Sequence, residues 1–212
     1  MTLVNTSAAE DLDAALGMYI RLRGDEALLK LEAGANLRGD VNLIADKMDL
    51  SGTITAVGET VTLQPYWSRN DAVNLGSTSD GATDTLELSD SELDNITTDV
   101  LRIGNSNVGP ITISQAISPA GSSALKLVTG SGVSQTGPLS VPKLAISAAS
   151  SIDLSGPGND VERLAAQTTT GSVLYADSNS SYDAANAIRI GRMMEDNGYG
   201  FFEEPCEFDD LW

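Results

Sequence analysis

The stretch LRIGNSNVGPITI, residues 101–113, contains two triplets in which aliphatic residues flank a polar one. Leu101-Arg102-Ile103 and Ile111-Thr112-Ile113 alternate with period two, which is typical of strands that bury one face. The segment between them, Gly104-Asn105-Ser106-Asn107, is rich in turn-forming residues. The stretch therefore predicts strand, turn and strand.

This unit recurs from about residue 37 to 176, mostly at intervals of about ten to fifteen residues. The recurring triplets include Met48-Asp49-Leu50, Leu86-Glu87-Leu88, Leu125-Lys126-Leu127, Leu144-Ala145-Ile146, Ile152-Asp153-Leu154 and Val173-Leu174-Tyr175. Met48-Asp49-Leu50-Ser51-Gly52 is echoed by Ile152-Asp153-Leu154-Ser155-Gly156. Imperfect repeats of this kind suit a β-solenoid, in which stacked coils bury aliphatic ladders. An antiparallel sandwich also fits the strand count, but the near absence of tight two-residue hairpin turns favours the solenoid.

Two segments depart from the strand pattern. Ser89 and Glu92 have capping-box spacing, which predicts a short helix with Leu93 and Ile96 pointing inward. Residues 1–36 fit no single pattern, and they are interpreted either as a short helix over residues 8–19 or as a degraded coil that caps the solenoid.

Composition excludes several kinds of function. A net charge of −18 disfavours nucleic acid and anionic lipid as partners. The absence of histidine excludes Ser-His-Asp, Cys-His and His-zinc sites, and the lone Cys206 excludes an intrachain disulfide. No stretch has the length of a membrane span, and no export signal is visible at the N-terminus. Aromatic residues make up only 5% of the chain, so we expect a core of small and aliphatic side chains.

The last forty residues have a different pattern. Residues 173–176 and 199–202 are apolar and predict strands, and residues 183–198 have helical spacing between them. Asp177 and Glu203 then follow the C-terminal ends of two parallel strands, where carboxylates converge. Their oxygen ligands would suit a hard cation such as magnesium.

Residues 37–172 resemble the repeat region of filamentous-haemagglutinin-like bacterial surface proteins. The resemblance rests on Val61-Thr62-Leu63-Gln64-Pro65, Ala72-Val73-Asn74-Leu75-Gly76, Leu86 to Leu93, Leu101-Arg102-Ile103-Gly104 and Ile111-Thr112-Ile113-Ser114. It implies a right-handed parallel β-helix from a large exported adhesin, with a host or cell-surface ligand as partner. It also implies an extracellular or cell-surface location for the parent protein, although the chain as written, without an export signal, would stay in the cytoplasm.

Residues 172–212 resemble the enolase superfamily, in particular its mandelate racemase and sugar-acid dehydratase branch. The resemblance rests on Asp177-x-Asn179, Ala187-Ile188-Arg189, Phe202-Glu203-Glu204-Pro205 and Asp209-Asp210-Leu211. It implies that Asp177 and Glu203 ligate magnesium and that Asn179 lies near the substrate. The family's two catalytic lysines would fall near residues 146–148, which here are Ile146, Ser147 and Ala148. A third carboxylate ligand would lie beyond Trp212, so we expect weak magnesium binding, no tightly bound cofactor and no turnover.

The sequence thus predicts a mainly β protein: a cap or degraded coil (1–36), a parallel β-helix or solenoid (37–172) and one β-α-β unit of a truncated (β/α) barrel (173–212). The favoured hypothesis is a non-catalytic surface-protein solenoid fused near residue 172 to an incomplete enzyme fragment. The alternative is a truncated magnesium-dependent dehydratase or racemase that acts on a hydroxy or sugar acid. No nucleic acid or membrane insertion is expected, whereas the solenoid ends could self-associate.

Overall fold

Parallel strands dominate the computed structural model, which describes residues 2–3, 12–13, 17–66 and 70–175. In chain order the elements are β1 (Thr2–Leu3), β2 (Leu12–Asp13), β3 (Met18–Arg21), β4 (Leu28–Leu31), β5 (Asn36–Arg38), β6 (Val41–Ile44), β7 (Lys47–Leu50), β8 (Thr53–Gln64), β9 (Ala72–Leu75), β10 (Thr85–Leu88), α1 (Asp90–Leu93), β11 (Ile96–Gly104), β12 (Ile111–Ile113), β13 (Ser122–Thr129), β14 (Val133–Gln135), β15 (Ser140–Ala148), β16 (Ile152–Leu154), β17 (Asp160–Thr168) and β18 (Val173–Tyr175).

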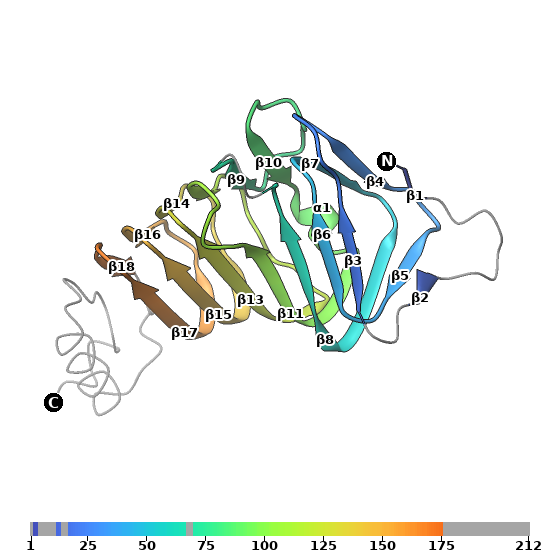
Figure 1. The fold of residues 1–212 in the computed structure, drawn as a ribbon. Helices are drawn as coiled ribbons and strands as arrows, with labels where there is room; N and C mark the ends of the chain where they lie inside the picture. Colours follow the sequence, from blue (N-terminus) through green and yellow to red (C-terminus); the bar gives the residue numbers. More distant parts are fainter. Residues whose placement is uncertain (1, 4–11, 14–16, 67–69, 176–212) are drawn as a thin grey trace, which may run out of the picture.

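The strands form three sheets that wind into a β-solenoid of about seven turns. One sheet has the order β1-β4-β7, a second has β10-β9-β12-β14-β16-β18, and the third runs β17-β15-β13-β11-β8-β5-β2, with β3 and β6 joined beside β8. Neighbouring strands come from successive coils, as Figure 1 shows for β11, β13, β15 and β17. The predicted solenoid is therefore confirmed in preference to the antiparallel sandwich.

The core consists of aliphatic ladders that run across the coils. Val61, Leu101, Leu125, Leu144 and Leu164 follow one another in direct cross-strand register. The first four are buried, and Leu164 is partly covered. Burying a leucine side chain stabilises a fold by roughly 1.5–3 kcal/mol, so a ladder of this kind holds neighbouring coils together. Among the described residues no aromatic side chain belongs to this core, in agreement with the composition.

The long strands of the third sheet bend in the middle. In β11 the inward positions Ile96 and Thr98 are followed by two outward residues, Asp99 and Val100, before Leu101 turns inward again. The register with β8 shifts at this point. One strand therefore covers two walls of the solenoid, a feature that period-two alternation alone does not predict.

The paired repeats at residues 48–52 and 152–156 adopt the same local structure. The hydroxyl Oγ of Ser51 donates to Asp49 over 2.8 Å, and that of Ser155 donates to Asp153 over 2.6 Å. The glycine that ends each repeat packs closely on the neighbouring coil: a Cβ on Gly52 would lie 2.6 Å from the Glu32 carbonyl oxygen. The sequence echo thus marks equivalent corners of the solenoid.

The predicted capping box is also confirmed. Ser89 is the N-cap of α1, its side chain accepts from the Glu92 amide, and the Glu92 carboxylate accepts from the Ser89 amide over 2.8 Å. Leu93 and Ile96 are fully buried, as the pattern predicts.

Coils extend on both sides of the expected repeat region. β3 pairs with β6 and β4 pairs with β7, so residues 18–31 already stack on the solenoid. At the other end β18 pairs with β16, from Ile152 opposite Val173 to Leu154 opposite Tyr175, so this strand stacks on the solenoid although the sequence assigned it to the barrel unit. The helix and second strand expected within residues 183–202 lie outside the described residues, and no β-α-β barrel unit is seen in the described part. No described helix has the length and apolar character that crossing a membrane requires.

Candidate functional site

The three site residues expected from the sequence cannot be placed. Asp177, Asn179 and Glu203 all lie outside the described residues, so their roles as magnesium ligands and substrate contact stay predictions. The structure does place the strand that precedes them, because β18 ends at Tyr175 on the last coil.

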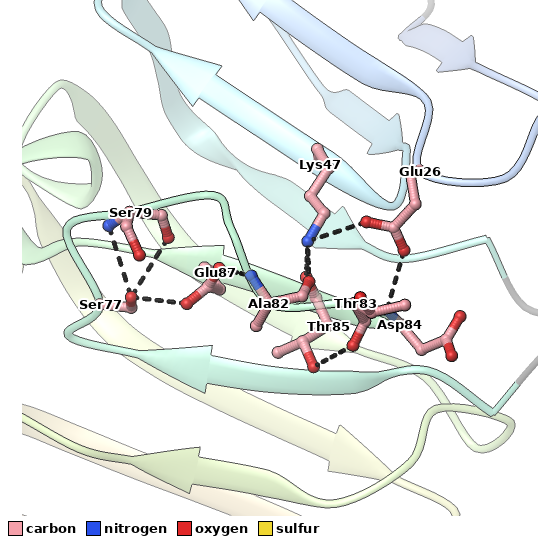
Figure 2. Close-up of polar contacts among 9 residues, drawn as sticks. All are labelled: Glu26, Lys47, Ser77, Ser79, Ala82, Thr83, Asp84, Thr85 and Glu87. Carbon is pink, nitrogen blue, oxygen red and sulfur yellow. Dashed lines mark hydrogen bonds and ion pairs between the residues drawn. The ribbon is translucent and has the colours of Figure 1, made fainter.

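A polar cluster lies elsewhere, where the loop of residues 76–84 joins β9 to β10. Its centre is Glu87 on β10, which is only 4% exposed. The Glu87 carboxylate accepts the Ser77 hydroxyl over 2.7 Å and the Ala82 amide over 2.7 Å. Figure 2 shows both bonds. A buried carboxylate needs such donors because burial without them is costly. Glu87 therefore fastens the loop of residues 76–84 to β10, the strand that follows the loop.

Lys47 on β7 binds the same loop from its other side. The residue is 4% exposed, and its ammonium group donates to the carbonyl oxygens of Ala82 and Thr85, the latter over 3.0 Å. Its charge is matched by Glu26, whose Oε2 lies 3.2 Å away. Figure 2 shows these contacts converging on the Lys47 Nζ atom. A lysine with one carboxylate and two carbonyl partners is satisfied as a structural cation.

Three acidic residues meet beside this lysine. One carboxylate oxygen from each of Asp25, Glu26 and Asp84 lies within 4.8 Å of the others. The two Glu26 oxygens are already engaged, since Oε1 accepts the Asp84 amide over 2.8 Å and Oε2 pairs with Lys47. Glu26 and Asp84 both hold left-handed backbone conformations, with φ of 54° and 50°. The contacts therefore hold two tight turns, one at Glu26 and one at Asp84, against each other. This arrangement is better suited to fixing a loop in place than to coordinating a hard cation.

Asp80, at the tip of the same loop, has an altered acidity. Partial desolvation raises its pKa to about 6, helped by the nearby carboxylates of Glu92, Glu87 and Asp49, while Lys47 acts in the opposite direction. Asp80 is itself exposed at the surface. A carboxyl group of this kind can respond to mildly acidic pH, whereas Glu87 and Lys47 in the same cluster are already engaged in hydrogen bonds and an ion pair that hold the loop.

Sequence reasoning missed the roles of Lys47 and Glu87. Glu87 stands between Leu86 and Leu88, both buried, so period two would place it on an outward, solvated face. The alternation of residues 86–88 does not indicate that a loop folds back over that face. The one available signal is the polar stretch of residues 77–84, which is longer than a tight turn needs.

Comparison with known proteins gives one match. A family model described as enolase C-terminal domain-like matches residues 112–212, a little under half of the chain. No curated protein and no solved structure matches. The match agrees with the enolase-superfamily resemblance of the C-terminal region, and it begins about sixty residues earlier than that resemblance.

The matched region and the solenoid overlap. Residues 112–175 hold the strands from β12 to β18 and, among the described residues, no helix. All of these strands pair in parallel with strands of adjacent coils. The described part of the match is therefore continuous with the solenoid that precedes it.

Proposed function

We propose that the chain is a non-catalytic β-solenoid of the bacterial surface or adhesin type, which presents its outer walls to a host or cell-surface ligand. The enolase-like sequence at its end is, in this proposal, an incomplete enzyme fragment joined to the solenoid near residue 172. The surface role is supported by the solenoid and by the resemblance of its repeats to surface-protein repeats.

The absence of catalysis rests on one observation about the core. The positions where the resemblance to the enolase superfamily would place the catalytic lysines, residues 146–148, lie at the end of β15. Ile146 is 3% exposed and Ala148 is 4% exposed, and both belong to the aliphatic core. Ser147 between them faces outward and lacks a basic group. A proton next to a carboxylate is removed only by a positioned base, and these positions supply none.

The alternative function is a truncated magnesium-dependent dehydratase or racemase acting on a hydroxy or sugar acid. The family match at residues 112–212 favours it. In that case Asp177 and Glu203 would hold the magnesium ion and Asn179 would contact the substrate. The ion would acidify the proton alpha to the substrate carboxylate.

Proton exchange separates the two functions. The full chain is incubated in heavy water with magnesium and either a mandelate-like or an aldonate compound, and loss of the alpha proton is followed by proton NMR. We expect no more exchange than in a control that contains magnesium and the compound without the protein. We also expect the Asp177→Asn variant to show the same exchange rate as the original chain. Exchange that Asp177→Asn and Glu203→Gln both abolish would establish the enzymatic alternative.

A second experiment tests the surface role. The full chain, labelled with a fluorophore, should bind host-cell surfaces saturably and should lose that binding when it is unfolded by heat. A folded chain that binds no better than the unfolded chain would contradict the surface role.

A further inference from the structure

The outer faces of β11, β13, β15 and β17 bring basic side chains together in a strongly acidic chain, while the carboxylates of the same strands, Asp99, Asp160 and Glu162, do not line the hollow that these basic residues share. Between residues 70 and 175 the sequence contains four basic residues, Arg102, Lys126, Lys143 and Arg163. Each comes from a different one of these four strands. All four line one open hollow of about 530 Å³, and no carboxylate lines it. We call these four residues the basic track.

The register places like charges directly beside one another. Arg102 is the cross-strand partner of Lys126, and Lys143 is the partner of Arg163. Like charges directly opposite each other in a sheet destabilise it. None of the four makes an ion pair with a described residue. The fold by itself gains nothing from this arrangement.

Arg102 adds an unsatisfied donor. Its Nε atom is buried and has no hydrogen-bond partner among the described residues. A buried donor left without an acceptor costs free energy. The Arg102 residue as a whole is partly exposed, so an external anion can pair with its guanidinium charge. The basic track therefore combines unpaired positive charge with a guanidinium whose hydrogen bonds are incomplete.

Small side chains line the hollow between the four cations. Ala124, Ala145 and Ala165 line it beside the cations, and neighbouring strands lie about 4.8 Å apart. The four strands carry one cation each, so the track crosses about 14 Å of sheet, and between Lys126 and Lys143 it shifts by two residues, about 7 Å along the strands. Within each pair the cations are one strand spacing apart, which is close to the length of a sugar ring. This geometry fits an extended anion that bears one charge per repeating unit and lies obliquely across the strands.

Other extended anions fit less well. No aromatic side chain lines the hollow, so the stacking platforms that bind single-stranded nucleic acid are missing. An acidic peptide would gain affinity by adding a strand at a sheet edge. The hollow instead lies on a sheet face, where β13 and β15 are already paired on both sides.

We propose that the basic track binds a linear uronate polysaccharide, a sugar chain with one carboxylate per ring. The chain lies across the four strands, and its carboxylates pair with Arg102, Lys126, Lys143 and Arg163. This inference rests on the proposed surface-binding role of the solenoid and names the ligand class for it.

Isothermal titration of the full chain with an oligogalacturonate tests the inference. We expect salt-sensitive binding and none to the methyl-esterified oligomer, which is uncharged. The double variant K126Q/K143Q should bind about tenfold more weakly, because two charge contacts made by exposed lysines are lost. The matched control is K30Q/R38Q, which changes the net charge equally on other walls and should stay within about twofold of the original chain.

Several results would overturn the inference: no binding, equal binding to the methyl ester, unchanged affinity in K126Q/K143Q with circular dichroism showing an intact fold, or tighter binding to oligothymidylate or oligoglutamate. If the folded chain still binds cell surfaces while the oligogalacturonate does not bind, this inference fails and the surface role stands. If both fail, the proposed function fails as well.

Discussion

At the scale of single residues, burial depends on which segment of the chain folds over the outer face of a strand. Lys47 and Glu87 would both be interpreted as solvated strand residues, yet each is 4% exposed because the loop of residues 76–84 packs over them. Local alternation tells which residues face the core, and it correctly places Met48 and Leu50 inside. It cannot tell what covers the other face, because the loop that covers Lys47 lies 35 residues further along the chain and the same loop folds back over Glu87 on the strand that follows it.

Asp80 gives the first prediction, which concerns pH. Its pKa of about 6 lies above the usual 3.8, so the folded state holds this proton between about pH 4 and 6 while the unfolded state has lost it. Stability attributable to Asp80 therefore falls as pH rises through that window, and at pH 7 the charged carboxylate is a cost. Asp80→Asn should raise the free energy of unfolding at pH 7 by about 1 kcal/mol, a value reduced for solvent screening.

Urea unfolding of the original chain and of Asp80→Asn at pH 4, 5, 6 and 7 measures this effect. The difference between the two should be smallest at pH 4, which serves as the internal control, and should grow toward pH 7. A difference that is constant with pH, or one that favours the original chain at pH 7, would contradict the assignment of the raised pKa.

At the scale of elements, the short strands and α1 follow from local sequence. Period-two triplets, turn residues and the Ser89 capping box act within a few residues, so they can be recognised without the tertiary structure. The bend of the long strands could not be predicted, because two outward residues in succession, such as Asp99 and Val100, look like the end of a strand. The basic track was missed for a related reason. Each cation looks like an ordinary outward residue until the register places Arg102 beside Lys126 and Lys143 beside Arg163.

Gly104, at the end of β11, carries the second prediction. Its φ is +81°, and an added Cβ would collide with the carbonyl oxygen of Val128 on the next coil. Both effects oppose a side chain, because the left-handed region is unfavourable for other residues and backbone cannot move aside cheaply. Gly104→Ala should lower the free energy of unfolding by about 2 kcal/mol or more.

The control is Gly81→Ala in the exposed loop before β10, where an added Cβ has no atom within 4 Å. Denaturant unfolding of both variants should show a clear loss for Gly104→Ala and almost none for Gly81→Ala. Equal losses would mean that the corner at Gly104 does not stack on β13 as described.

At the scale of the whole molecule, the solenoid could be predicted because each coil repeats the same aliphatic pattern. Its extent was harder to predict, since residues 18–31 pair with β6 and β7 although their pattern is irregular. The predicted right-handed winding and the magnesium ligands Asp177 and Glu203 stay predictions. Those two residues and Asn179 lie outside the described residues, so their roles rest on the sequence motif alone.

The central claim is that residues inside the enolase-like match form stacked solenoid coils. Ala145 on β15 and Ala165 on β17 are direct cross-strand partners, whereas Gln167 is displaced by two residues along β17. Disulfides require Cα atoms about 4.4–6.8 Å apart, a range that adjacent parallel strands satisfy and the displaced position does not.

The decisive measurement is disulfide formation under mild oxidation in a C206S background, read by mass spectrometry after proteolysis. We expect rapid, nearly complete bridging in A145C/A165C and little in the matched pair A145C/Q167C. Failure of A145C/A165C to bridge, or equal bridging of both pairs, would contradict the stacked solenoid.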